Sequence, residues 1–498
     1  MFEKITPEAA GISSANVRRF IEKLEKRGAI MHSVLLFRHG KMFAEHYWAP
    51  YNKDSLNRMY SQTKSYVAMA IGLLEEEGKL SLDDKIADYF PEKIDGEISE
   101  HLKSLTIKNM LTMTTTGECR WWFAEGDPDR THLYFNGRDR ARSQGTYWEY
   151  DSAGSQVLSA LAEKLSGMKL LDYLKSKVFN KIGSFKNARI LMCPNGDSWG
   201  DSALLCTSRD MATGGQLMLN GGVWDGEQLL PAKYVKDATS PLVSNKISWQ
   251  WSPFYGAGYG YQIWQAPEGG FAFVGMGDQI TLCLPDKDFM FVCTADHQAP
   301  ANLGDKHMRT TLINALYDII VDNLSDTPLP ENKTEYQEYI EATSGLKLRA
   351  SVGIEDSPLR EKIDGVLYEC DGNPMGITRF SFVFNGEDCG EFRYTNAQGD
   401  KVIPFGINRN VFGKFPELGY ASEYGEVKTT DGFMYDDAVS LAFLDSERLI
   451  LDVKIIDKYL GTMSAVFGFN GEFAAASFSK AAEHFLEEYT GILTAKKA

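Results

Sequence analysis

A serine and a lysine three residues apart, at the start of an apolar helix, are the pair in this chain best suited to chemistry. They belong to the string Ser61-Gln62-Thr63-Lys64, which leads into an apolar run over 66–74. Residues three apart lie on one face of a helix, so the hydroxyl and the amine are expected to be neighbours. A lysine in a water-poor pocket favours its neutral form and can take the serine's proton. The spacing therefore predicts a nucleophile with its base.

The same spacing occurs three more times, and context separates the first string from the others. Ser166 and Ser344 are each followed by a glycine, and Ser477 is expected to open a C-terminal helix whose lysine is solvated. Most isolated Ser-x-x-Lys strings are exposed helix starts. Only the Ser61 string begins a helix apolar enough to be buried on nearly all sides, and this favours a catalytic pair there.

A Ser/Lys pair needs a second proton carrier and an oxyanion hole. Tyr150-Asp151-Ser152 stands before a predicted helix, where Asp151 or Ser152 can cap the helix and hold Tyr150 in the loop. Gly275-Met276-Gly277-Asp278-Gln279 lies at the end of one predicted strand and the start of the next, where the amide of Met276 can donate to an oxyanion. Each string also fits a structural role, with Tyr150 anchoring a turn and the glycine forming a plain β-bulge.

Length, charge and cysteine content narrow the class of protein. The 498 residues predict two or three domains, and the net charge of -16 argues against nucleic acid or an anionic membrane as a partner. The N-terminal residues carry charges throughout, and no segment approaches the ~20 apolar residues of a membrane span, so a cytoplasmic protein is expected. The seven cysteines contain no Cys-x-x-Cys pair and favour reduced thiols over a zinc site. No metal or cofactor is predicted.

The pattern over residues 1–326 predicts one α+β domain. Strands are expected on both sides of a helix-rich middle that starts with the Ser61 helix and ends near residue 238. This order indicates an antiparallel sheet that is flanked by helices and completed by both ends of the domain. The expected helices are 13–27, 155–165, 171–179, 208–219 and 305–323, and the expected strands are 33–38, 42–47, 258–265, 271–275, 279–284 and 289–294.

A second unit is expected after a linker at 327–345. Residues 346–498 alternate short strands with glycine and aspartate turns, which predicts an all-β domain, a barrel or a sandwich, with one helix near 479–489. This domain contains no catalytic constellation. Packing, a lid over the pocket and contact within a homo-oligomer remain its candidate roles.

Six segments, in this order along the chain, resemble the motifs of the class C β-lactamase-like serine hydrolases. This family includes penicillin-binding proteins, D-aminopeptidases, family VIII esterases and 6-aminohexanoate-dimer hydrolase. The resemblance covers roughly residues 5–325. The segments are Tyr60-Ser61-Gln62-Thr63-Lys64-Ser65, the stretch from Leu73 to Lys85 with Tyr89-Phe90-Pro91, Leu105 to Thr114, Tyr150-Asp151-Ser152, Thr207 to Ala212, and Phe273-Val274-Gly275.

The resemblance implies a β-lactamase/transpeptidase-like fold and a role for each motif. Ser61 would be the acylated nucleophile, and Lys64 and Tyr150 the pair that moves the proton. The amides of Ser61 and Met276 would form the oxyanion hole, with Gly275 and Ser152 beside the substrate. The implied activity is hydrolysis of an ester or amide of a small molecule.

Two departures from the lactamase pattern bear on the substrate. Phe273 stands where a cation would help to hold the carboxylate of a penicillin or a D-alanyl peptide. Ser152 replaces the asparagine that lactamases use near the substrate amide. Both changes favour the esterase and amidase branches. Trp121-Trp122-Phe123 and the stretch 129–142 either line the pocket or form a surface loop.

Two other interpretations compete with turnover by a serine hydrolase. One keeps the fold but makes the protein a sensor, acylated by a β-lactam or peptide with negligible turnover. The other, an α/β-hydrolase, would need a Ser-His-Asp triad. His32 and His297 lie at the ends of predicted strands, where structural histidines are commoner than catalytic ones. We rank it last.

Overall fold

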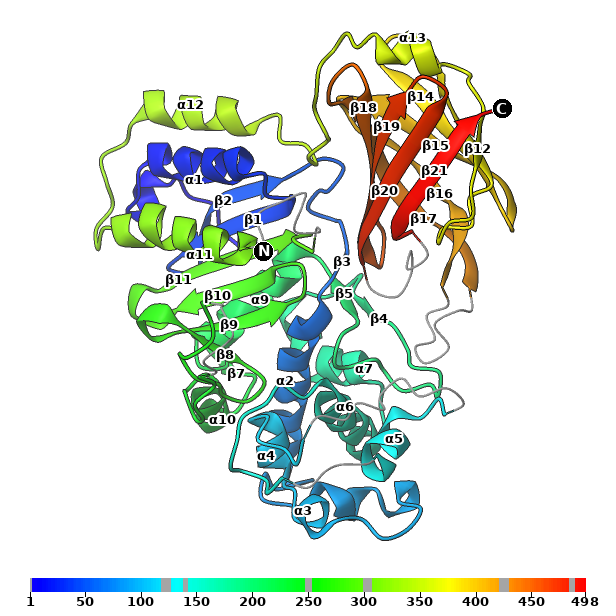
Figure 1. Ribbon diagram of the computed structural model, residues 1–498. Helices are drawn as coiled ribbons and strands as arrows, with labels where there is room; N and C mark the ends of the chain where they lie inside the picture. The colour runs from blue at the N-terminus through cyan, green and yellow to red at the C-terminus, as the bar shows by residue number, and fades with distance from the viewer. Residues whose placement is uncertain are drawn as a thin grey trace.

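The computed structural model describes residues 2–117, 127–137, 142–246, 253–298, 307–420, 430–482 and 489–498. Two units are visible in Figure 1: a lower part with a sheet between helices, and a closed β-sheet at its upper right. In the described ranges, no helix is both long and apolar enough to cross a membrane.

One antiparallel sheet forms the centre of the first unit. Its order is β2-β1-β11-β10-β9-β8, so strands from the two ends of the domain pair side by side through β1 and β11. This confirms the predicted α+β arrangement. The strand expected at 258–265 is largely wrong, because only its last two residues belong to β8. The strands are β1 (Met31–Arg38), β2 (Lys41–Tyr47), β8 (Trp264–Ala266), β9 (Gly270–Gly275), β10 (Gln279–Leu284) and β11 (Phe289–Ala295).

Three helices cover one face of this sheet: α1 (Ser14–Arg27), α11 (Met308–Ile319) and α12 (Lys333–Thr343). Figure 1 shows them stacked beside β1 and β11. Helix α1 begins where the Ser13 hydroxyl accepts from the backbone of Asn16 and ends at Gly28, which has a left-handed φ of 79°. Its apolar residues, at the spacing of one helix face, are buried in the core.

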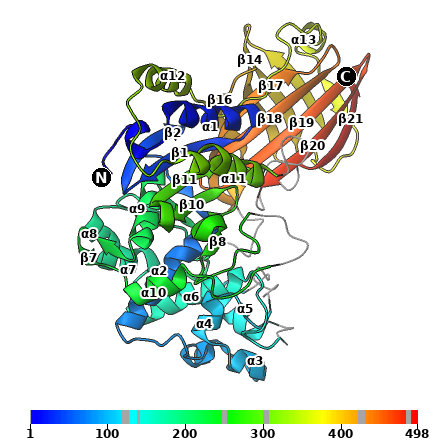
Figure 2. The same cartoon turned by 90° about the vertical axis from the view of Figure 1, so that its left-hand side faces the viewer.

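Helices α2 (Thr63–Glu76) and α9 (Ser208–Leu219) lie on the other face, with a helical layer beyond them. This layer ends farthest from the closed sheet at α3, as Figures 1 and 2 show. The remaining α-helices of the first unit are α3 (Glu100–Lys103), α4 (Ile107–Leu111), α5 (Arg130–Asn136), α6 (Ser152–Ser166), α7 (Leu170–Leu174), α8 (Asn180–Ile182) and α10 (Ala232–Ala238), and its short strands are β3 (Asn57–Arg58), β4 (Arg189–Ile190), β5 (Leu204–Cys206), β6 (Val223–Trp224) and β7 (Glu227–Gln228).

The second unit is a β-barrel, which decides between the predicted barrel and sandwich. Its strands pair in sequence from β12 to β15 and from β17 to β21, β12 pairs with β21, and a parallel pairing of β15 with β17 closes the ring. Strand β16 adds to β17 outside the ring. The elements are α13 (Leu359–Ile363), β12 (Tyr368–Cys370), β13 (Arg379–Phe384), β14 (Cys389–Asn396), β15 (Gly399–Ile407), β16 (Val411–Tyr420), β17 (Thr430–Phe443), β18 (Arg448–Ile456), β19 (Leu460–Asn470), β20 (Phe473–Ala482) and β21 (Gly491–Lys497).

Aromatic side chains fill the interior of the barrel. Phe382 packs against Phe392 and Phe467 with ring centroids 5.0 Å apart in each pair, and all three are buried. The helix expected near 479–489 is wrong over its first four residues, which continue β20 in register with β19. Residues 483–488 lie outside the described residues.

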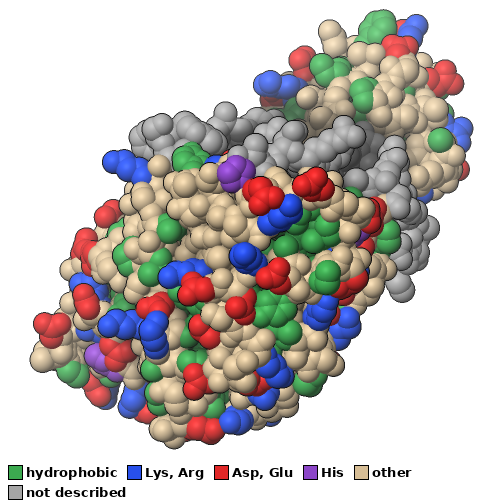
Figure 3. Space-filling view, turned by 90° about the horizontal axis from the view of Figure 1, so that it is seen from below, with side chains coloured by type: hydrophobic (Ala, Val, Ile, Leu, Met, Phe, Trp, Pro, Cys, Tyr) green, Lys and Arg blue, Asp and Glu red, His purple; other side chains and the backbone are tan. Residues whose placement is uncertain are grey.

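Loops of the barrel contact the first unit close to the Ser61 string. The backbone N–H of Leu460, at the start of β19, donates to the Tyr60 hydroxyl at 2.9 Å. The Arg58 guanidinium lies 4.8 Å from the ring centroid of Tyr459. Figure 3 shows the molecule from below, where acidic and basic side chains are interspersed on the surface of the first unit.

Candidate active site

Ser61 lies where the chain enters helix α2. The 3-10 turn Tyr60–Gln62 leads directly into the helix, and Ser61 is partly exposed while residues 63–74 are buried. Tyr60 has a left-handed φ of 48°, a conformation that costs a residue other than glycine about 1–3 kcal/mol. Its hydroxyl accepts the Leu460 hydrogen bond, so the barrel stabilises the turn before the serine.

Lys64 contacts both Ser61 and a loop distant in the sequence. Its Nζ donates to Ser61 Oγ at 3.1 Å and to the backbone oxygen of Asp201 at 2.7 Å. The lysine side chain is buried. The structure thus brings Ser61 and Lys64 together at the start of α2, and the amine is held within proton-transfer distance of the hydroxyl.

Tyr150 lies beside Lys64 at the end of the loop before α6. The lysine Nζ is 5.1 Å from the centroid of the Tyr150 ring. The ring stacks on Trp264 with centroids 5.7 Å apart and planes 20° apart. Trp148 and Tyr255 pack against the same tryptophan at 5.6 and 5.1 Å. This aromatic cluster fixes the plane of the Tyr150 ring.

The residue that caps α6 is Asp151, one of the two candidates for that position. Its carboxylate accepts from the backbone N–H of Gly154 at 2.9 Å and from the Thr115 hydroxyl at 2.8 Å. Ser152 is the first residue of the helix and is partly buried. The cap sets the direction in which the chain leaves Tyr150.

The turn after β9 runs close to the nucleophile. A Cβ atom on Gly275 would lie 2.1 Å from the backbone oxygen of Met59, so only glycine lets the strand pass this closely to the turn before Ser61. Met276 follows and is exposed. Gly277 and Asp278 then take left-handed φ values of 74° and 69°. The predicted oxyanion segment and the predicted nucleophile are therefore neighbours.

A buried ion-pair cluster holds this turn. Asp278 bonds His297 Nδ1 at 2.8 Å and Arg309 Nε at 2.5 Å. Burial raises the pKa of the Asp278 carboxyl, but Arg309 and His297 outweigh it and lower that pKa to about 2. The backbone N–H of His297 donates to Gly277 O at 3.2 Å, and the Gln279 amide donates to Met276 O at 3.1 Å. Of this cluster, sequence reasoning did not single out Arg309.

Phe273 is fully buried in β9. Its ring packs against Tyr66 of α2 with centroids 6.1 Å apart. An apolar side chain therefore occupies the place that the resemblance assigns to a cation.

Asp201 is a further residue of the site that sequence reasoning missed. Its carboxylate lies 3.8 Å from Lys64 Nζ and 3.8 Å from Arg130 Nη1, and it is almost fully buried. Burial raises the pKa of the Asp201 carboxyl, and the charges of Lys64 and Arg130 oppose that shift. Asp201 belongs to no motif, and its contact with Lys64 joins residues 137 positions apart, so no local pattern marks it.

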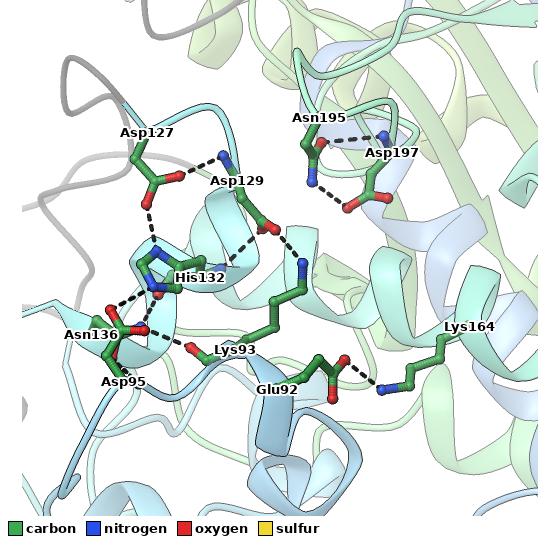
Figure 4. A network of polar contacts seen from close by, with 10 residues as sticks. All are labelled: Glu92, Lys93, Asp95, Asp127, Asp129, His132, Asn136, Lys164, Asn195 and Asp197. Atoms are coloured by element: carbon green, nitrogen blue, oxygen red, sulfur yellow. Dashed lines mark hydrogen bonds and ion pairs between the residues drawn. The ribbon is translucent and has the colours of Figure 1, made fainter.

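Helix α5 brings Arg130 to Asp201, and a polar network anchors this helix (Figure 4). Asp129 caps the helix by accepting from the His132 backbone at 3.0 Å, and Lys93 bonds the same carboxylate. The His132 ring bonds Asp127 at 2.5 Å and Asp95 at 2.8 Å. Part of the predicted stretch 129–142 thus reaches the site.

The predicted segment Trp121-Trp122-Phe123 lies outside the described residues, as do positions 138–141 of the predicted stretch 129–142. Within the described ranges, no group of three or more His, Cys, Asp or Glu side chains could hold a metal ion.

Comparisons with known proteins agree on one family. A family model described as Beta-lactamase matches residues 17–313. The 6-aminohexanoate-dimer hydrolase of Paenarthrobacter ureafaciens is 24% identical over 217 residues, which is 41% of this chain and 55% of that protein. The chain thus spans about half the length of this curated relative.

Two solved structures show the same fold at low identity. A putative 6-aminohexanoate-dimer hydrolase from Bacillus anthracis has a TM-score of 0.52 and 19% identity, and the match covers 66% of this chain and 89% of that one. EstCE1, a hydrolase with promiscuous acyltransferase activity, has a TM-score of 0.50 and 15% identity over 61% of this chain and 98% of that one.

Proposed function

The chain belongs to the β-lactamase family, and from this premise we propose that it cleaves an ester or amide bond of a small molecule through an acyl-enzyme on Ser61. The contact between Lys64 Nζ and Ser61 Oγ at 3.1 Å carries the proposal. It unites the nucleophile and the base on one buried helix, with the hydroxyl accessible at its start.

In the acylation step, Ser61 Oγ attacks the substrate carbonyl while the neutral amine of Lys64 takes the hydroxyl proton. The carbonyl oxygen gains negative charge, which the backbone N–H groups of Ser61 and Met276 stabilise. The close approach of β9 to the turn before Ser61 supports this pairing of amides. The proton then passes through Lys64 and Tyr150 to the leaving alcohol or amine, and the carbon–oxygen or carbon–nitrogen bond breaks.

Deacylation repeats these transfers with water as the nucleophile. The Lys64/Tyr150 pair takes a proton from water, the ester bond to Ser61 breaks, and Ser61 Oγ recovers a proton. The carboxylate of Asp201, 3.8 Å from Lys64 Nζ, stabilises the ammonium form that appears in both steps. Asp201 therefore acts as a positioning residue for Lys64.

The substrate class follows from the site's apolar character. Buried Phe273 supplies no cation for a substrate carboxylate, and Trp148, Trp264 and Tyr255 surround Tyr150 with aromatic rings. These features favour esters and amides of apolar acyl groups over β-lactams. Ser152, which stands where lactamases have an asparagine, supports the same preference against β-lactams.

We place the catalytic part in residues 1–326, with 327–345 as a linker and 346–498 as an accessory domain. Ser61, Tyr150 and Met276 all precede residue 326. Helix α12 lies in the linker and packs on α1.

Labelling with a serine-directed fluorophosphonate tests the proposal. Peptide mapping should find the adduct on Ser61, and Ser61→Ala should abolish it. Ser166→Ala is the matched control, because Ser166 also starts a Ser-x-x-Lys string yet should leave labelling unchanged. Pre-steady-state kinetics separate turnover from the sensor interpretation. A burst of about one equivalent of product per chain, with no steady-state turnover after it, would contradict hydrolysis and support the sensor.

A further inference from the structure

A cavity of 920 Å³ lies where the first unit meets the barrel. The segment that leaves α12 and runs to the barrel borders it, together with Ile30 just before β1, Asp296 and His297 just after β11, and residues of β16, β18 and β19. Ser61, Lys64 and Tyr150 do not line it. Its volume is in the range of small-molecule sites, which often form at domain interfaces.

Two cations lie on the connecting segment between α12 and the barrel. Lys347 and Arg349 both line the cavity and are exposed, and in the described ranges neither forms an ion pair. Gly28 makes room for the arginine, because a Cβ atom at that position would lie 2.2 Å from Arg349 Nη1. Its left-handed φ of 79° independently favours glycine. The guanidinium is thus seated against the end of α1.

Of the two acids that line the cavity, one already forms an ion pair and the other is buried. Asp452 pairs with Lys454 at 2.5 Å and accepts from the Ser351 hydroxyl at 3.3 Å. Asp296 is buried, and burial raises the pKa of its carboxyl, which disfavours its charged form. Lys347 and Arg349 therefore create a locally positive site on a chain whose net charge is -16.

Apolar side chains lie next to these cations. Val352 and Phe412 are 73% and 52% exposed, which is unusual for large hydrophobic residues, and both line the cavity. Leu348 and Ile450 are buried in its wall. A ligand that fits this lining needs an apolar body and one anionic group.

We propose that this interdomain cavity binds a small amphipathic anion, an aliphatic chain that ends in a carboxylate. Arg349 and Lys347 hold the carboxylate, and Val352, Phe412 and Ile450 contact the chain. The proposal is independent of the hydrolase activity, since Ser61, Lys64, Tyr150 and Met276 do not line the cavity, although His297 of the Asp278 cluster does.

Titration calorimetry with decanoate tests it, on the full-length Ser61→Ala protein so that no turnover interferes. Decanoate should bind with one site per chain, and decyltrimethylammonium, with the same chain and the opposite charge, should bind much more weakly. Arg349→Ala should weaken decanoate binding by about tenfold or more, the usual loss for one charge-assisted hydrogen bond. Phe412→Ser should weaken binding of both probes.

Lys236→Ala is the matched control, because Lys236 is an exposed lysine of α10 outside the cavity and should not alter binding. Lys347→Ala provides a second surface variant if Arg349→Ala fails to fold. Equal binding of the two probes would refute the charge recognition. Decanoate binding that neither Arg349→Ala nor Lys347→Ala weakens would place the ligand elsewhere and overturn the proposal.

Discussion

The carboxylate of Asp201 lies 3.8 Å from the Nζ atom of Lys64, and the backbone oxygen of the same residue accepts a hydrogen bond from that atom at 2.7 Å. One loop residue therefore contacts the lysine twice, while the lysine contacts Ser61. Because both side chains are buried, water screens their attraction little. The surroundings of Lys64 therefore depend on a residue outside every motif.

Asp201→Asn should lower kcat with little change in KM. The amide keeps the size of the side chain but removes the charge that stabilises the ammonium of Lys64. The ammonium form is then less favoured, so the acid limb of the kcat/KM profile should move to lower pH by about one unit or more. The pH profile on a short activated ester measures this. Asp197→Asn, a partly buried acid four residues away, is the control, and an unchanged acid limb in Asp201→Asn would remove Asp201 from the mechanism.

Substrate preference gives a second prediction. The protein should hydrolyse short p-nitrophenyl esters but turn over cephalosporins poorly, since buried Phe273 offers no charge to their carboxylate. Loss of one charge-assisted hydrogen bond predicts a deficit of roughly ten- to a hundredfold for the lactam. The ratio of the two kcat/KM values measures it. Efficient cephalosporin turnover would contradict the argument from Phe273.

Asp278 should make folding stability depend on acid pH. Its folded pKa of about 2 lies below the ordinary 3.8, so its contribution is present above about pH 3.8 and is lost as pH falls toward 2. The difference corresponds to about 2 kcal/mol. Asp278→Asn should therefore lower the unfolding free energy at pH 7 by about that amount, measured by urea denaturation. The deficit should shrink as pH falls below 4.

Asp286→Asn is the control for this effect, because Asp286 is an exposed acid in the turn between β10 and β11. It should unfold like the unmodified protein. A deficit for Asp278→Asn that persists unchanged at pH 2 would mean that the carboxylate charge is not its cause.

The predictable part of the site is local in the sequence. Ser61 and Lys64 meet because three residues nearly complete one helical turn, and the capping acid Asp151 stands directly before its helix. The contact of Lys64 with Asp201 depends on how β5 and its preceding loop pack on α2. No periodic pattern in the sequence predicts that contact.

The errors in the fold have similar causes. Tyr259, Tyr261 and Ile263 alternate like strand residues, but Gln262 takes a left-handed φ of 56°, and its side chain bonds the backbone of α4 instead. Residues 479–482 resemble the start of a helix, yet they pair with β19 within the barrel. In both places tertiary contacts outweigh the local preference.

A double-mutant cycle tests whether Lys64 and Tyr150 act as one proton-transfer unit. Tyr150→Phe should slow acylation by roughly 10²–10⁴-fold, the usual contribution of a general acid–base group, and Lys64→Met should be at least as damaging. Since both residues serve the same proton, the double variant should lose much less than the product of the two single losses. Stopped-flow acylation rates on an activated ester and on an amide measure each step.

Circular dichroism must first show that all three variants fold, because Lys64 also bonds Asp201 O, and that bond contributes to stability. Tyr255→Phe serves as the aromatic control: it removes a hydroxyl from the same cluster and should leave acylation unchanged. If the double variant instead loses as much as the product of the two single losses, the two residues act independently, which contradicts a shared proton path. A Tyr150→Phe protein with an unchanged rate on both substrates would leave Lys64 as the only proton carrier of the mechanism.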